Sequence, residues 1–228
     1  MRGVCIIPAR GGSKRLPRKN IAEFLGRPIL AHTVDAAQAS GLFSRVVVST
    51  EDAEIAAAAR EGGAEVHERS DTLATDTARL VDVCIGFLDE EIRAGRDWDF
   101  FACLLATAPM RSADDIRRAH ALIEPGISEF AMAVTSYPLP PLQALRMTDG
   151  GFMRPMWPDL INLRSQEAPP LYVDNGSTYI ALVPAFRKER TFYGSRLRGH
   201  VMPRERSIDI DEPHDLELAR WLAQRPRA

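Results

Sequence analysis

The densest group of chemically useful side chains lies within the first twenty residues. An apolar run ends at Pro8, and a Gly-Gly-Ser turn follows at residues 11–13. Five basic residues surround this turn, and no acidic residue occurs before Glu23. Glycines let backbone N–H groups approach an anion closely, and cations neutralise its charge. The stretch therefore predicts a phosphate-binding loop whose cations are Arg10, Lys14, Arg15, Arg18 and Lys19.

This loop matches neither of the common nucleotide-binding motifs. No Gly-Lys-Ser/Thr closes it, as a Walker A motif requires, and G-x-G-x-x-G does not occur. A short basic run is also typical of a solvated face or a nucleic-acid patch. The net charge of −2 gives no global attraction for nucleic acid. A small anionic ligand is therefore favoured, and no nucleic-acid partner is expected.

A second candidate site lies near the end of the chain, where Asp209 and Asp211 are two residues apart. In an extended segment both carboxylates share one face, with Cα atoms about 6.6 Å apart. Mg²⁺ bound with a nucleoside triphosphate typically uses one or two carboxylates plus phosphate oxygens. Asp211 is equally well placed, just before Glu212-Pro213, to cap a helix. Spacing alone leaves both interpretations open.

Other polar clusters are less informative. Arg164-Ser165-Gln166 and Asp174-Asn175-Gly176 suit a polar substrate, although Asp-Asn and Asn-Gly steps are also ordinary turn chemistry. The histidines are scattered without H-E-x-x-H, and no G-x-S-x-G occurs. Neither a zinc protease nor a serine hydrolase is indicated.

Strands and helices alternate along most of the chain. Apolar runs predict strands at 4–7, 45–50, 65–67, 100–105, 130–136, 178–183 and 201–202. Helical spacing and caps predict helices at 28–41, 52–62, 80–94, 112–124 and 213–224. This order is typical of a single α/β domain, residues 1–228, with a doubly wound, mostly parallel sheet. Ligand sites in such folds lie at the C-terminal strand ends, where the basic loop and residues 106–109 both fall.

The alternation of strands and helices stops at about residues 138–172, which are rich in Pro, Met and Arg. Asp149-Gly150-Gly151 predicts a hairpin turn. Phe152, Met153, Met156 and Trp157 beside it are costly to leave exposed. We expect this small insert to pack on a partner subunit and form a dimer; a lid on its own chain is the alternative.

Composition places the chain among globular proteins. It has 228 residues, 45% hydrophobic and 26% charged. No apolar run reaches membrane-spanning length and no signal peptide precedes the first strand, so no membrane partner is expected. Cys5, Cys84 and Cys103 lie among apolar neighbours without C-x-x-C spacing, which predicts small core residues in a reducing cytoplasm.

Both ends of the chain resemble one enzyme family. Residues 7–21, IPARGGSKRLPRKNI, resemble the signature loop of the acylneuraminate cytidylyltransferases, which are the CMP-sialic acid synthetases and their relatives. Residues 207–216, SIDIDEPHDL, resemble the terminal metal-binding motif of that family. The resemblance extends from residue 4 to about residue 220, and the two motifs together are specific.

The resemblance implies a nucleotide-diphospho-sugar transferase-like fold and a homodimer with crossing inserts. It implies that CTP and a nonulosonic acid react to CMP-sugar and pyrophosphate, with Mg²⁺ as cofactor. Arg10, Lys19 and Asp211 would be catalytic, and Asp209 and Asp211 would hold the metal. By position, the nucleotide would contact Pro8, Ala9, Arg10, Ser13, Lys14, Lys19, Asn20, Arg69 and Asp76. The sugar acid would contact Thr107, Arg164, Ser165, Gln166 and Asn175.

The substrate loop departs from the usual pattern. Sialic acid synthetases usually carry QPTSPLR where residues 105–111 read LATAPMR. This form, RLPR at 15–18, and RSQ at 164–166 followed by PPLY at 169–172 look more like pseudaminic acid cytidylyltransferases. That branch usually has AGQFYW, whereas residues 175–180 read NGSTYI. Pseudaminic acid or a close relative is favoured; N-acetylneuraminate and legionaminate are the alternatives.

Two further interpretations compete with this one. CMP-Kdo synthetases look similar in the first strand but usually carry an Arg-Tyr loop, and Gly11-Gly12 argues against them. A nucleotide-binding module without turnover comes from another class of protein. The Asp209/Asp211 pair together with Lys19 argues against it, because binding alone would not need both.

Overall fold

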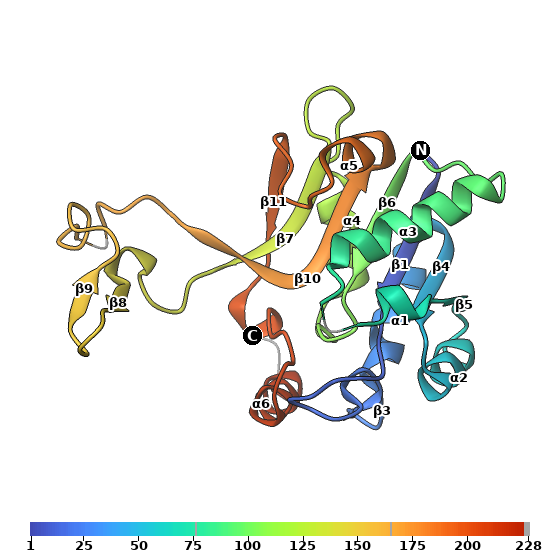
Figure 1. Cartoon of the computed structure of the whole chain (residues 1–228), viewed down its shortest axis with the longest axis horizontal. Helices are drawn as coiled ribbons and strands as arrows, with labels where there is room; N and C mark the ends of the chain where they lie inside the picture. The colour runs from blue at the N-terminus through green and yellow to red at the C-terminus, as the bar shows by residue number, and fades with distance from the viewer. Residues whose placement is uncertain (76, 165, 226–228) are drawn as a thin grey trace.

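A seven-stranded sheet forms the centre of the protein (Figure 1), seen in a computed structural model that describes residues 1–75, 77–164 and 166–225. The strand order is β11-β7-β10-β6-β1-β4-β5. All neighbouring pairs run parallel except those of β10, which is antiparallel to both β6 and β7. The predicted mostly parallel α/β sheet is therefore confirmed. Its strands are β1 (Gly3–Pro8), β4 (Phe43–Thr50), β5 (Glu65–Glu68), β6 (Phe100–Leu104), β7 (Phe130–Ser136), β10 (Tyr172–Leu182) and β11 (Leu197–Val201).

Helices cover both faces of this sheet. Along β1, Cys5 and Ile7 face one apolar cluster, whereas Val4 and Ile6 face the other. This alternation buries a continuous apolar run on both sides, as parallel strands require. The first cluster contains side chains of α1 (Ile29–Ser40), α2 (Ala53–Glu61) and α4 (Ala113–His120). The second contains side chains of α3 (Leu80–Arg93) and α5 (Val183–Glu189). A third, smaller cluster contains side chains of α6 (Pro213–Ala223).

Local signals positioned most of these elements correctly. The Asp52 side chain accepts hydrogen bonds from the N–H groups of Glu54 and Ile55 and so begins α2. Ser112 begins α4, as predicted, but that helix ends at His120 instead of Glu124. The residues after it form turns, because the Glu124 N–H bonds to the carbonyl of Ser128 and reverses the chain toward β7.

Some elements were misplaced or missed. The strand predicted at 201–202 is β11, which ends at Val201. The short helix α5 and the two-residue strands β2 (Glu23–Phe24) and β3 (Arg27–Pro28) were not predicted, because they are too short for a periodic pattern. The 3₁₀ helices are η1 (Lys19–Ile21), η2 (Asp71–Leu73), η3 (Pro141–Gln143) and η4 (Arg204–Arg206).

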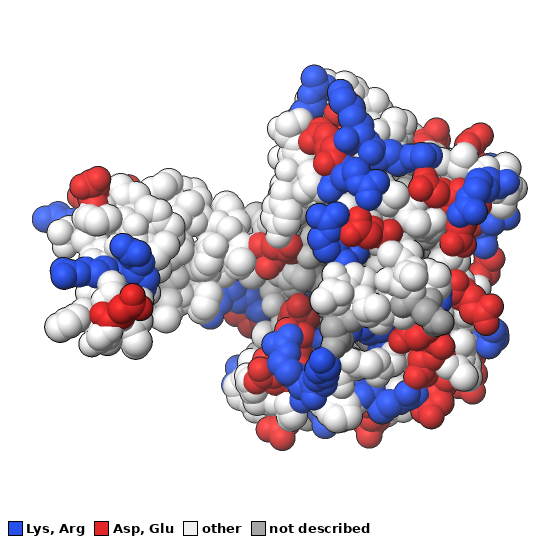
Figure 2. Space-filling view, viewed as in Figure 1, with Lys and Arg blue, Asp and Glu red and all other residues white. Residues whose placement is uncertain are grey.

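Residues 137–171, here called the arm, leave the sheet after β7 and return in β10. They project far from the body of the molecule (Figure 1). The predicted hairpin turn is confirmed, since β8 (Leu145–Met147) pairs with β9 (Met153–Pro155) around glycines with φ of +91° and +83°. Large apolar side chains stay exposed on it, including Phe152 at 68% and Met147 at 67%. Charged groups are interspersed over the body, whereas the narrow part of the arm next to the body is largely uncharged (Figure 2).

Two further expectations can be compared with the structure. Cys5, Cys84 and Cys103 are buried and unpaired by disulfides, as predicted for core residues. Across the described part of the chain, no helix combines the length and the apolar character needed to span a bilayer.

Candidate active site

A cavity of about 540 Å³ opens at the C-terminal ends of β1 and β6. A ligand site was predicted at these strand ends from the fold class. Its wall consists of the loop after β1, the stretch between Arg69 and Val83, and the loop after β6. Asp211 reaches it from the C-terminal segment. The structure thus brings together Pro8, Arg10, Ser13, Lys14, Lys19, Asn20, Arg69, Thr107 and Asp211. We call this the nucleotide cavity, after the ligand that the sequence predicts for these residues.

Four of the five cations of the basic loop line this cavity. The exception is Arg18, whose backbone is left-handed with a φ of 57°. Its guanidinium lies 2.5 Å from Asp52 and 2.5 Å from Glu54, at the start of α2. Because these carboxylates neutralise it, Arg18 anchors the loop to α2.

Close packing fixes the shape of the loop. The Gly11 N–H donates to the carboxylate of Glu51 at 2.7 Å. A Cβ atom on Gly11 would lie only 2.4 Å from the Asp52 carboxylate, so glycine is needed there. Asn20, predicted to contact the nucleoside, is buried, and its side-chain amide donates to the Arg10 carbonyl at 2.8 Å. Asn20 thus closes the loop that carries Arg10.

Two other predicted nucleotide contacts pack against β4. Ala9 is fully buried, and its N–H donates to the Ser49 carbonyl at 3.0 Å. Arg69 donates to the same carbonyl at 2.6 Å, and burial lowers the pKa of its guanidinium. Asp76 lies outside the described residues.

Asp211 lies opposite the basic loop. Its carboxylate accepts from Lys19 Nζ at 2.6 Å and from the Arg15 guanidinium at 2.6 Å. Burial raises the pKa of Asp211, but the contacts with Lys19 and Arg15 outweigh it and leave that pKa below its ordinary value. The helix-capping interpretation of Asp211 is not the arrangement found, because Glu212 and Asp215 form the capping box of α6.

Asp209 occupies a different environment. Burial raises its pKa above the ordinary value, while a hydrogen bond with the Thr107 side chain acts in the opposite direction. A Cβ atom on Gly176 would lie 2.6 Å from an Asp209 carboxylate oxygen. Gly176 also has a φ of +66°. Glycine at 176 therefore lets Asp209 approach the backbone of β10 closely.

A second cavity of about 890 Å³ adjoins the first through Leu105. Asp209 and Asn175 line it, and the Asn175 amide donates to Ser207 at 3.1 Å. Sequence inspection missed its most organised feature, in which the hydroxyls of Tyr179 and Tyr193 donate to Asp174 at 2.9 and 2.7 Å. The Asp174-Asn175-Gly176 cluster indicated a polar site in the sequence, whereas no sequence pattern linked the two tyrosines to it. We call this the substrate cavity.

Three predicted sugar contacts belong to the arm. Arg164 and Gln166 line neither of the two cavities as described in the single chain. The Arg164 carbonyl accepts from Glu167 and Ala168 in a local turn. Ser165 lies outside the described residues. The role predicted for these side chains stays a prediction.

The two aspartates are candidate ligands of a divalent metal ion. Among the residues that the structure describes, no group of three or more His, Cys, Asp or Glu could hold a metal ion alone. Asp211 lines the nucleotide cavity and Asp209 lines the adjoining one. Burial disfavours the ionised form of Asp209, and a cation beside it would favour that form. Together with Asp211, Asp209 suits a divalent cation that takes its remaining ligands from phosphate oxygens.

Comparisons with known proteins agree with this geometry. A family model described as Cytidylyltransferase matches residues 4–124. Pseudaminic acid cytidylyltransferase from Campylobacter jejuni is 34% identical over 97% of this chain and 96% of its own. CMP-N,N'-diacetyllegionaminic acid synthase from Legionella pneumophila is 33% identical over 98% and 97%. N-acylneuraminate cytidylyltransferase from Streptococcus agalactiae is 31% identical over 94% of this chain but 52% of its own.

A solved structure supports the fold. CMP:2-keto-3-deoxy-manno-octonic acid synthetase complexed with CTP superposes with a TM-score of 0.69, covering 98% of both chains. At 18% identity this likeness concerns the fold alone. The family model and the full-length relatives confirm the resemblance seen in the two terminal motifs, and the chain belongs to the cytidylyltransferase family of nucleotidyltransferases.

Proposed function

We propose that this enzyme transfers CMP from CTP to a nonulosonic acid, with release of pyrophosphate, and that pseudaminic acid is its substrate. The observation that carries the proposal is the meeting of Lys19 and Asp211 at the nucleotide cavity, beside a larger cavity. One cavity suits a triphosphate, and its neighbour has room for a sugar acid.

Cations of the loop would hold the triphosphate. Arg10, Ser13, Lys14 and Lys19 line the nucleotide cavity. The anomeric hydroxyl of the sugar attacks the α-phosphorus, a new P–O bond forms, and the bond to the β-phosphate breaks. Negative charge grows on the leaving pyrophosphate oxygens. Arg10 and Lys19 stabilise that charge in the transition state, which is the main contribution a protein makes to such a step.

Asp209 and Asp211 would bind the divalent ion, which we propose is Mg²⁺. When bound, Mg²⁺ supplies positive charge to the phosphate oxygens. The residues fit this role because Lys19 and Arg15 keep Asp211 ionised, and a cation beside the buried Asp209 would favour the ionised form of that carboxylate. Asp211 would then both orient Lys19 and offer an oxygen to the metal.

The sugar acid would occupy the substrate cavity. Thr107 lines the nucleotide cavity close to Leu105, which both cavities share, and Asn175 lines the substrate cavity. Pseudaminic acid is favoured because the Campylobacter jejuni relative of that name matches nearly the full length. Residues 175–180 differ from the usual pattern of that branch, so N-acetylneuraminic and legionaminic acids are the competing substrates.

A homodimer built by the arm is part of the same proposal. Its support is the set of apolar side chains left exposed on the arm, which a partner surface would cover. Arg164, Ser165 and Gln166 would then meet the sugar bound to the partner subunit. The unpaired cysteines and the use of CTP suit the cytoplasm.

The test is pyrophosphate release with CTP, Mg²⁺ and a panel of pseudaminic, legionaminic and N-acetylneuraminic acids and Kdo. We expect release with pseudaminic acid. Release with another panel member would correct the substrate and keep the reaction. CTP binding without release across the panel would overturn the sugar assignment. A failure to bind CTP would overturn the reaction itself.

A further inference from the structure

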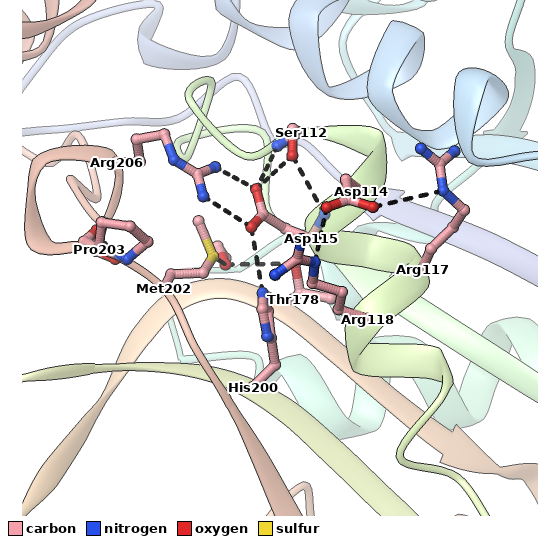
Figure 3. A network of polar contacts seen from close by, with 12 residues as sticks. Ser112, Asp114, Asp115, Arg117, Arg118, Thr178, His200, Met202, Pro203 and Arg206 are labelled. Atoms are coloured by element: carbon pink, nitrogen blue, oxygen red, sulfur yellow. Dashed lines mark hydrogen bonds and ion pairs between the residues drawn. The ribbon is translucent and has the colours of Figure 1, made fainter. Parts of the chain in front are cut away.

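Asp115 is a buried carboxylate that lines neither of the two cavities and yet collects several donors (Figure 3). One oxygen accepts from the Ser112 N–H at 2.9 Å and the Ser112 hydroxyl at 2.6 Å. The other lies 3.2 Å from His200 Nε2 on β11. The Arg206 guanidinium binds both oxygens, one of them at 3.0 Å. This is a bidentate, charge-assisted pair, the most directional contact that Arg makes.

These donors come from segments that lead into the active site. Ser112 follows the loop after β6, whose residues 105–107 line the nucleotide cavity. Arg206 ends η4, immediately before the segment 207–211 that carries both aspartates. The Ile210 N–H donates to the Thr107 carbonyl at 2.9 Å, which joins the same two segments again. Asp115 therefore connects the loop after β6 to segment 207–211.

We infer that Asp115 is a positioning residue, which sets Asp209 and Asp211 against the nucleotide cavity through its contacts with Arg206 and Ser112. This inference rests on the proposed function, because it assigns Asp209 and Asp211 to the metal. Replacing a complete buried ion pair by apolar groups often changes stability little, since desolvation offsets the attraction, whereas removing one partner leaves a buried charge unpaired. We assign the Asp115–Arg206 pair a role in geometry. Displacing reactive groups by about 1 Å can cost about 100-fold in rate.

The test compares Asp115→Asn with Asp114→Asn. Asn keeps the shape at 115 but loses the charge and one of the two acceptors for Arg206. Asp114 is the neighbour on α4, and its exposed carboxylate pairs with Arg117 and Arg118 on the same helix (Figure 3). For Asp115→Asn we expect kcat to fall about 10- to 100-fold and the Mg²⁺ concentration for half-maximal rate to rise several-fold. Asp114→Asn should match the wild type.

A second readout separates positioning from simple loss of folded protein. Binding of Mn²⁺ in the presence of CTP, followed by electron paramagnetic resonance, needs no sugar. We expect weaker Mn²⁺ binding in Asp115→Asn and an intermediate weakening in Arg206→Lys, which keeps the charge but not the fork. Wild-type Mn²⁺ binding and wild-type kcat per folded molecule in Asp115→Asn would overturn the inference. If the wild type binds Mn²⁺ together with CTP but shows no turnover, that result contradicts only the proposed reaction with the sugar.

Discussion

The ammonium nitrogen of Lys19 lies 2.6 Å from a carboxylate oxygen of Asp211, although 192 positions separate the two residues. The second oxygen of Asp211 is held at 2.6 Å by Arg15. One carboxylate thus organises two cations of the phosphate loop and stays ionised because of them. The loop after β1 and the segment before α6 are therefore joined at the point where the chemistry is proposed.

Removing this carboxylate should abolish most activity without unfolding the protein. We expect Asp211→Ala to lose about 100- to 1000-fold in kcat, comparable to losing one charge-stabilising group. The fold should survive because the Asp211 side chain is 36% exposed and belongs to no apolar cluster. Pyrophosphate release and thermal unfolding measure the two effects. Asp35→Ala, which breaks the exposed pair with Arg27, is the control. Near-normal turnover in Asp211→Ala would contradict the assignment.

Gly176 should be intolerant of even a methyl group. In Gly176→Ala the new Cβ meets the Asp209 carboxylate at 2.6 Å, and the backbone keeps a φ of +66°. We expect about 1–2 kcal/mol of destabilisation from the left-handed backbone and, separately, a large loss of activity from the displaced carboxylate. Gly126→Ala isolates the first effect, because Gly126 has a φ of +81° with no atom within 4 Å of its Cβ position. Equal activity losses in the two variants would count against a role for Asp209.

Glu91 should make stability depend on acid pH. Burial raises the pKa of its carboxyl, but hydrogen bonds from Arg96, Arg45 and Trp98 outweigh this and lower that pKa to about 2, from 4.5. Since the pKa is lower in the folded state, the stabilisation is complete above about pH 4.5 and is lost as the pH falls toward 2.

We therefore expect Glu91→Gln to reduce the free energy of unfolding by about 3 kcal/mol at pH 7. The difference from the wild type should shrink between pH 4.5 and 2. Urea unfolding across this range measures it. Glu90→Gln, which removes a half-exposed partner of His67, should cost about 0–1 kcal/mol. A difference for Glu91→Gln that does not change with pH would contradict the assignment.

Polar substitutions on the arm should separate the proposed dimer. Phe152 and Met153 are 68% and 55% exposed, so Phe152→Ser with Met153→Ser removes apolar area without disturbing a core. By sedimentation velocity we expect a monomer for this variant and a dimer for the wild type. Ile127→Ser, at a side chain 56% exposed on the body, should leave the dimer intact. A dimer that survives the double substitution would make the arm a lid on its own chain.

Signals confined to neighbouring residues were sufficient for much of this molecule. The apolar run before Pro8, the caps at Asp52 and Ser112 and the glycine turn at 149–151 each act within a few positions, so the sequence alone located these elements. The same holds for the basic loop, whose chemistry is set by residues next to one another.

Tertiary structure decided which of these residues meet. No local pattern indicates that Arg18 turns to Asp52, that Tyr179 and Tyr193 converge on Asp174, or that Asp115 receives Arg206 from 91 positions away. Such pairs depend on the strand order, in which β10 lies antiparallel between β6 and β7. The packing of distant segments sets those contacts, and residue spacing along the chain does not predict them.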